Sequence, residues 1–102
     1  MWTVRYSRQA AKAIKAKKGT NKLSDEARGA LDALHLDLEE DGPTQNTWPH
    51  YSKLKNQKKG LDKRHCHLVR GNPTYVACWE VINTKKKVME VYYAGTHEKA
   101  PY

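Results

Sequence analysis

The sequence predicts an α+β domain in which two N-terminal helices pack on one face of an antiparallel sheet. Two observations indicate this class. Residues 8–42 hold two segments with helical spacing of apolar side chains, and residues 43–102 hold segments that alternate apolar and polar side chains. Helices grouped before a run of strands are typical of α+β folds. A chain of 102 residues corresponds to one domain, residues 1–102.

The N-terminal part begins with a strand that leads into the two helices. Residues 2–7, WTVRYS, alternate apolar and polar side chains, so we expect a strand with one buried face. Ser7 can cap a helix rich in alanine and lysine, which Gly19 ends. Ser24 caps the second helix, which stops at Gly42. In this helix, apolar residues recur at spacings of four, three and four: Ala27, Leu31, Leu34 and Leu38.

The rest of the chain predicts three or four consecutive strands. Residues 63–70, 74–82 and 88–94 alternate or are rich in β-branched and aromatic residues. A short strand is also expected at 48–55, where Pro49 limits pairing and indicates a strand start or an edge. The element order is therefore strand, helix, helix and then an antiparallel meander. With both helices on one face, the other face of the sheet stays open for a ligand.

The net charge of +8 is unevenly distributed. Residues 1–23 carry seven basic and no acidic side chains, residues 24–42 carry one basic and seven acidic, and residues 43–102 carry eleven basic and four acidic. Two basic blocks around an acidic one favour a polyanion as partner, with nucleic acid the first candidate. The simpler alternative is that the charge serves solubility alone.

Cellular location follows from what the sequence lacks. No apolar run comes near the roughly 20 residues that cross a membrane. The N-terminal stretch MWTVRYSRQ has no apolar core of a secretory signal. We therefore expect a cytoplasmic protein with no membrane partner. In that compartment Cys66 and Cys78 are expected as thiols, with a bridge between neighbouring strands as the less favoured alternative.

The stretch KRHCHLVRG, residues 63–71, combines two histidines with a cysteine. On a strand, His65 and His67 point one way while Cys66 and Leu68 point the other way. A cysteine nucleophile with a histidine base needs both side chains on one face, so this stretch disfavours that chemistry. A structural zinc site needs four ligands in paired spacing, which the chain lacks. We expect neither a metal nor another cofactor.

A second group of chemically active side chains lies in the tail, where His97, Glu98, Lys99 and Tyr102 fall within six residues. RNA cleavage through the 2′-hydroxyl needs a base, an acid and positive charge for the phosphate oxygens. Histidine, glutamate, lysine and tyrosine supply these functions, and aromatic rings stack on unpaired bases. Taken singly, each histidine is more simply an ordinary surface residue. The hypothesis requires that the tail return to the open face.

Four blocks of sequence, in this order, resemble a known family over essentially the whole chain. They are WTVRYSRQAAKAI, HYSKLK, KRHCHLVRGNPTYVACWEV and EVYYAGTHEKAPY. The chain resembles the RelE/ParE superfamily of toxins from type II toxin–antitoxin systems, in the RelE-like branch of cytotoxic translational repressors. The resemblance implies a RelE-like fold and metal-independent cleavage of messenger RNA on the ribosome. It also implies a cognate antitoxin as partner, and we expect a monomer or weak dimer when the protein is free.

The resemblance also implies roles for individual residues. His97 follows the glycine where such toxins carry a catalytic arginine or histidine, and Tyr102 lies close to their terminal tyrosine. His65 and His67 lie on the strand where relatives carry lysines. The expected catalytic residues are therefore His97, His65, His67, Arg64 and Tyr102. The expected RNA-binding residues are Lys53, Lys55, Lys63 and Lys99.

One position departs from the family pattern. Val76 stands where many relatives have an arginine, so stabilisation of the phosphate falls to Arg64, Lys53 or Lys55 in this chain. This departure leaves two alternatives open. One is a ParE-like toxin that inhibits gyrase without nuclease activity, and the other is a non-catalytic RNA-binding module.

Overall fold

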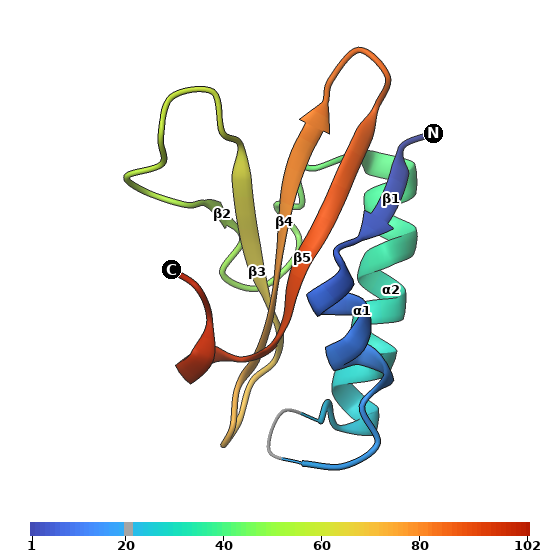
Figure 1. Cartoon of the computed structure of the whole chain (residues 1–102), viewed down its shortest axis with the longest axis vertical. Coiled ribbons are helices and arrows are strands. Elements are labelled where there is room, and N and C mark those ends of the chain that lie inside the picture. The colour runs from blue at the N-terminus through green and yellow to red at the C-terminus, as the bar shows by residue number, and fades with distance from the viewer. Residues whose placement is uncertain (20–21) are drawn as a thin grey trace.

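The predicted order of helices and strands is confirmed by the structure, a computed structural model that describes residues 1–19 and 22–102. Two helices follow the first strand, and all other strands come after them (Figure 1). The elements are β1 (Thr3–Tyr6), α1 (Arg8–Lys15), α2 (Asp25–Asp41), β2 (Ser52–Lys53), β3 (Lys63–Val69), β4 (Tyr75–Asn83), β5 (Val88–Thr96) and the 3-10 helix η1 (His97–Lys99).

The five strands form one sheet in the order β1-β5-β4-β3-β2. β2 to β5 make the expected antiparallel meander, but β1 pairs with β5 in parallel, so the sheet is mixed rather than antiparallel throughout. The alternation in residues 2–7 marks a strand and its buried face but carries no information about its direction. The long connection through α1 and α2 allows β1 to run beside β5 in the same direction.

The core lies between α2 and the sheet, and both helices cover the same face (Figure 1). The predicted stripe of α2 is buried and packs against side chains of β3, β4 and β5, with Trp79 of β4 fully buried among them. α2 ends at Gly42, whose φ is 85° and where a Cβ would lie 2.8 Å from the Trp2 indole nitrogen. No helix in the described part of the chain is long and apolar enough to cross a bilayer.

The first helix is shorter than the sequence predicts. It begins after the Ser7 cap, whose hydroxyl accepts a hydrogen bond from the Ala10 N–H, and ends at Lys15 rather than near Gly19. The guanidinium of Arg28, on α2, donates hydrogen bonds to the carbonyl oxygens of Ile14 and Ala16. These bonds satisfy carbonyls that have no partner within the helix and tie the end of α1 to α2.

The strand expected at 48–55 is reduced to the two residues of β2. Pro49 has no N–H to donate, and His50 adopts a φ of 55°, outside the range of a strand. The Pro49 carbonyl instead accepts a hydrogen bond of 2.8 Å from the His67 N–H of β3. The segment before β2 is therefore a loop held against β3, which matters for the site described below.

Packing of α2 on the sheet predicts that two leucines of that helix contribute very differently to the free energy of unfolding. Leu34 is 0% exposed and Leu36 is 60% exposed. We expect Leu34→Ala to lower the free energy of unfolding by about 2–5 kcal/mol, because it leaves a cavity in the core. Leu36→Ala is the matched control, with an expected change within about 0.5 kcal/mol. Urea unfolding of both variants measures this, and equal effects would contradict the described core.

Candidate functional site

β3 separates its side chains between the two faces of the sheet, as the alternation predicts. Arg64, Cys66 and Leu68 are buried on the side of the helices, and Cys66 and Leu68 belong to the core. His65 and His67 are half-buried and point to the opposite face. The expected placement of Cys66 beside Leu68 is therefore confirmed, and both histidines lie on the face that the helices leave open.

The C-terminal tail returns across this open face (Figure 1). Gly95, near the end of β5, leaves room for the Tyr93 ring, because a Cβ there would lie 2.8 Å from the Tyr93 hydroxyl. That hydroxyl donates a hydrogen bond of 2.7 Å to the Thr96 carbonyl. The next residue, His97, donates its N–H to the Thr74 carbonyl at 2.8 Å. These contacts fix the start of the tail beside the end of β3.

The histidines of β3 and the tail converge with Tyr102 on this open face. The ring centroids of His67 and His97 are 5.3 Å apart, and those of His65 and Tyr102 are 4.6 Å apart. The His65 and His67 rings are separated by 6.0 Å, and the His97 and Tyr102 rings by 6.1 Å. Four of the five predicted catalytic residues thus form one group, which we call the histidine cluster.

A further histidine joins the cluster from the loop before β2. The His50 ring stacks on the His67 ring with a centroid distance of 4.2 Å. The hydrogen bond from the His67 N–H to the Pro49 carbonyl fixes the preceding residue of this loop. No pattern in the sequence signals His50, because its position depends on a left-handed φ and on a loop packed against β3. We include His50 in the histidine cluster from here on.

The surroundings of the cluster favour neutral side chains. Burial and the neighbouring histidines lower the pKa of both His65 and His67 from the ordinary value of 6.5. Both imidazoles are therefore mainly neutral near pH 7 and can accept a proton. Burial raises the pKa of Tyr102 to about 12, so its hydroxyl keeps its proton and acts as a hydrogen-bond donor.

The floor beneath the cluster is apolar. Val76 pairs with His67 and Cys78 pairs with His65 across β3 and β4, and both floor residues are fully buried. The family resemblance implied an arginine at the position of Val76. Val76 itself contributes packing and no charge. Burial raises the pKa of Cys78 to about 12, so its thiol is not a ready nucleophile.

Three hollows border the cluster. One of about 380 Å³ is lined by residues 52–56 with His65 and Tyr102. A second, of about 310 Å³, lies between His67, residues 71–74, His97 and Glu98. The third, of about 640 Å³, is lined by Pro49, His50, His67, Leu68, Arg70 and Thr74. Because the second and third share His67 and Thr74, His67 stands where these two hollows meet.

The predicted lysines occupy different positions around this surface. Lys55 lines the hollow beside His65 and Tyr102. Lys53 lines that hollow too, but its register with Arg64 directs its side chain to the other face, where its charge helps to lower the pKa of Asp62. Lys63 places its ammonium 5.1 Å from the centre of the Tyr92 ring, and Lys99 lines a separate cavity of about 210 Å³ with residues of α1 and β5.

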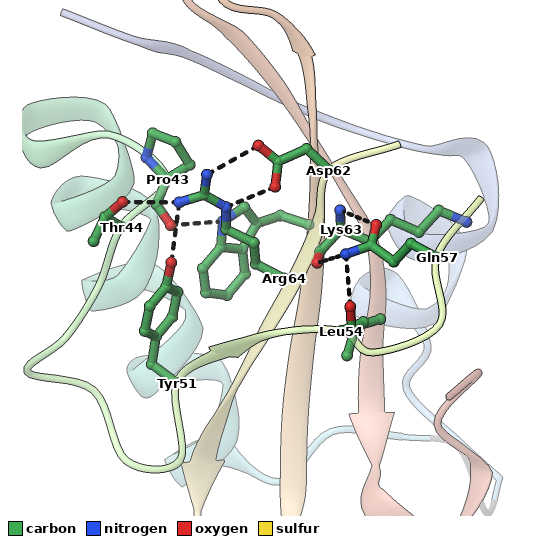
Figure 2. A network of polar contacts seen from close by, with 9 residues as sticks. Pro43, Thr44, Tyr51, Leu54, Gln57, Asp62, Lys63 and Arg64 are labelled. Carbon is green, nitrogen blue, oxygen red and sulfur yellow. Dashed lines mark hydrogen bonds and ion pairs between the residues drawn. The ribbon is translucent and has the colours of Figure 1, made fainter. Parts of the chain in front are cut away.

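Arg64 does not join the cluster, and its expected contact with the phosphate is corrected here. Arg64 is 7% exposed and lies on the helix-covered face. Figure 2 shows its guanidinium donating two hydrogen bonds of 2.9 Å to Asp62 and further bonds to Thr44 and Tyr51. The side chain instead holds the loop after α2 and the turn before β3 against the sheet.

A second side chain in Figure 2 fixes the loop that carries Lys55. The Gln57 amide nitrogen donates to the Leu54 and Lys63 carbonyls, and its oxygen accepts from the Lys63 N–H.

Histidines that gather in this way can also form a metal-binding site. Within residues 1–19 and 22–102, no group of three or more histidine, cysteine, aspartate or glutamate side chains is arranged to hold a metal ion.

Comparison with known proteins gives one informative similarity. No family model and no curated protein sequence matches the chain. The structure is similar to the YafQ toxin in the crystal structure of the E. coli DinJ-YafQ toxin-antitoxin complex, with a TM-score of 0.68. The alignment covers 99% of this chain and 98% of that chain at 19% sequence identity. The chain has a RelE-like fold. The RelE-like fold expected from the sequence blocks is thus confirmed.

The lowered pKa values predict how the stability of this RelE-like domain depends on pH. Between the folded-state pKa of His65 and His67 and the ordinary value of 6.5, the unfolded chain binds more protons than the folded one. The free energy of unfolding should therefore rise with pH through this window. The rise that these two histidines cause should be complete above about pH 6.5. Urea unfolding between pH 5 and 7.5 tests this. Replacing both histidines with asparagine should flatten the dependence, and an unchanged slope would contradict the assignment.

The contacts of Arg64 predict a structural role. Arg64→Ala should lower the free energy of unfolding by about 3 kcal/mol, because Asp62, Tyr51 and Thr44 lose a charged donor. Arg70→Ala, an exposed position just after β3, is the matched control, with an expected change within about 0.5 kcal/mol. Thermal or urea unfolding of the two variants provides the comparison. A fully stable Arg64 variant would show that the network does not hold the loop.

Proposed function

We propose that this chain is the toxin of a toxin–antitoxin system and that it cuts messenger RNA on the ribosome in the cytoplasm. The observation that carries the proposal is the convergence of His65, His67, His97 and Tyr102 on the open face of a basic domain. The RelE-like fold supports it, because the similar chain is itself a toxin of such a system. Ordinary surface histidines have no reason to gather from β3, a loop and the tail.

The proposed reaction is attack of the ribose 2′-oxygen on the neighbouring phosphorus. His67, whose pKa is lowered by burial, accepts the 2′-hydroxyl proton, and His97 donates a proton to the leaving 5′-oxygen. A phosphorus–oxygen bond forms to the 2′-oxygen as the bond to the 5′-oxygen breaks. The products are a 2′,3′-cyclic phosphate and a 5′-hydroxyl. The 5.3 Å between the two rings suits proton transfer on opposite sides of one phosphorus.

Other side chains stabilise the charge and orient the RNA in this proposal. Tyr102 donates a hydrogen bond to a phosphate oxygen, which its raised pKa allows at neutral pH. Lys55 supplies positive charge from the same hollow. His65 lies between Tyr102 and His67 and orients both rings, while His50 stacks on His67 and limits its rotation. Arg64 has no part in this reaction.

The proposed partner is a small antitoxin. The similar toxin was crystallised as a complex with its antitoxin. On this chain the hollows around the histidine cluster include the basic residues Lys55 and Arg70, so a segment that fills them would be acidic or amphipathic. Such a segment would block the histidines directly and release activity when removed.

His97→Ala is the decisive variant for the nuclease proposal. Inducible expression of the unaltered chain should arrest growth and produce new messenger-RNA ends on translated transcripts. Loss of one proton-transfer group should reduce cleavage about 100- to 10,000-fold and restore growth. His35→Gln is the control, because His35 lies on α2 and bonds to Tyr6, away from the cluster. Far-ultraviolet circular dichroism confirms that both variants fold.

Two results would replace this proposal with another function. Growth arrest with DNA-damage signalling and intact messenger RNA would indicate a gyrase inhibitor. Harmless expression of the unaltered chain, with salt-dependent RNA binding in vitro, would indicate a non-catalytic RNA-binding module. Cleavage that persists in the folded His97 variant would remove His97 from the reaction.

A further inference from the structure

One of the hollows around the cluster contains a carboxylate, which the cleavage reaction as proposed does not use. This hollow of about 310 Å³ is lined by His67, Gly71, Asn72, Pro73, Thr74, His97 and Glu98. Its volume falls at the lower end of the roughly 300–1,000 Å³ typical of small-ligand sites. Two of its walls are the histidines that flank the proposed reaction centre. A nucleotide next to the cut phosphate can therefore extend its base into this hollow.

The carboxylate of Glu98 sets the chemical character of the hollow. The side chain is exposed, and in the described part of the chain no hydrogen bond or ion pair holds it. Asp62 and Glu90, by contrast, pair with arginines. A carboxylate repels phosphate, so it weakens rather than strengthens general binding of RNA. Its position in a hollow that faces the reaction centre fits recognition of a base and not of the backbone.

A carboxylate accepts hydrogen bonds and donates none, and this limits which base it can bind. Guanine presents two adjacent donors, N1–H and the N2 amino group, on its Watson–Crick edge. Adenine, cytosine and uracil each place an acceptor beside their donor on this edge, so an acceptor-only group meets one favourable and one unfavourable contact. Guanine is therefore the base that matches Glu98.

We propose that Glu98 selects a guanine at a position directly next to the cleaved phosphate. This inference rests on the proposed ribonuclease function and adds its base preference. Asn72, in the same hollow, carries an amide that can donate to the guanine O6. The Pro73 and His97 rings offer faces on which the base can stack. Glu98 is thus a specificity-determining residue, while the histidines carry the chemistry.

The test uses the full chain and ribosomes programmed with messages that differ only in the bases flanking the cut. The unaltered protein should cleave messages with guanine at one flanking position about 5- to 100-fold faster than the other three. Glu98→Gln should lose this preference, because an amide both accepts and donates hydrogen bonds and so matches an adjacent donor and acceptor on any of the four bases. Glu40→Gln, on the exposed surface of α2, is the matched control and should keep the guanine preference.

The outcomes separate this inference from the proposed function. Cleavage by the unaltered protein without preference for guanine, or a Glu98→Gln variant that keeps the guanine preference, would overturn the role of Glu98 and leave the nuclease intact. Equal loss of cleavage on all messages by the Glu98 variant would also overturn it, because that pattern indicates a catalytic or structural role. Absence of cleavage by the unaltered protein would instead refute the proposed function.

Discussion

The alternation of buried and half-buried side chains along β3 is the constraint on which the rest of the structure depends. Burying Cys66 and Leu68 against α2 directs His65 and His67 to the opposite face. A shift of the strand by one residue would exchange the two sets and bury imidazoles in an apolar core. The network of Arg64 works in the same direction, because it anchors the start of β3 to the loop after α2. Packing on one side of the sheet thus determines the chemistry available on the other.

The histidine cluster depends on three segments that are distant in sequence. β3 supplies two rings, the loop before β2 supplies His50, and the tail supplies His97 and Tyr102. Each of the latter two segments is fixed by a backbone hydrogen bond, from His67 to Pro49 and from His97 to Thr74. At His65 and His67 the neighbouring histidines add to the effect of burial and lower the pKa of each imidazole. The same contacts that position His65 and His67 therefore also favour their neutral forms.

Periodicity predicted the elements well where one face is buried, as in α2 and β3. It failed where a distant contact decides the local structure: Arg28 ends α1 early, and the packing of Pro49 against β3 turns most of a predicted strand into a loop. The alternation of β3 was enough to place His65 and His67 on the open face, whereas the position of His50 depends on a loop packed against β3 and could not be predicted. Arg64 was misassigned because its charge suggested phosphate binding, although its place in the alternation put it on the buried face. For assigning a role to Arg64, the direction of its side chain was a better guide than its charge.

The parallel pairing of β1 with β5 has a consequence for how the protein is made. The first strand to leave the ribosome is bonded to the last strand of the sheet, with β4, β3 and β2 on the far side of β5. Sequence-distant pairing of this kind must wait until nearly the whole polypeptide has been synthesised. Residues of β1 therefore remain without their sheet partner during most of translation. A nascent fragment that lacks β5 also lacks the tail and therefore cannot assemble the histidine cluster.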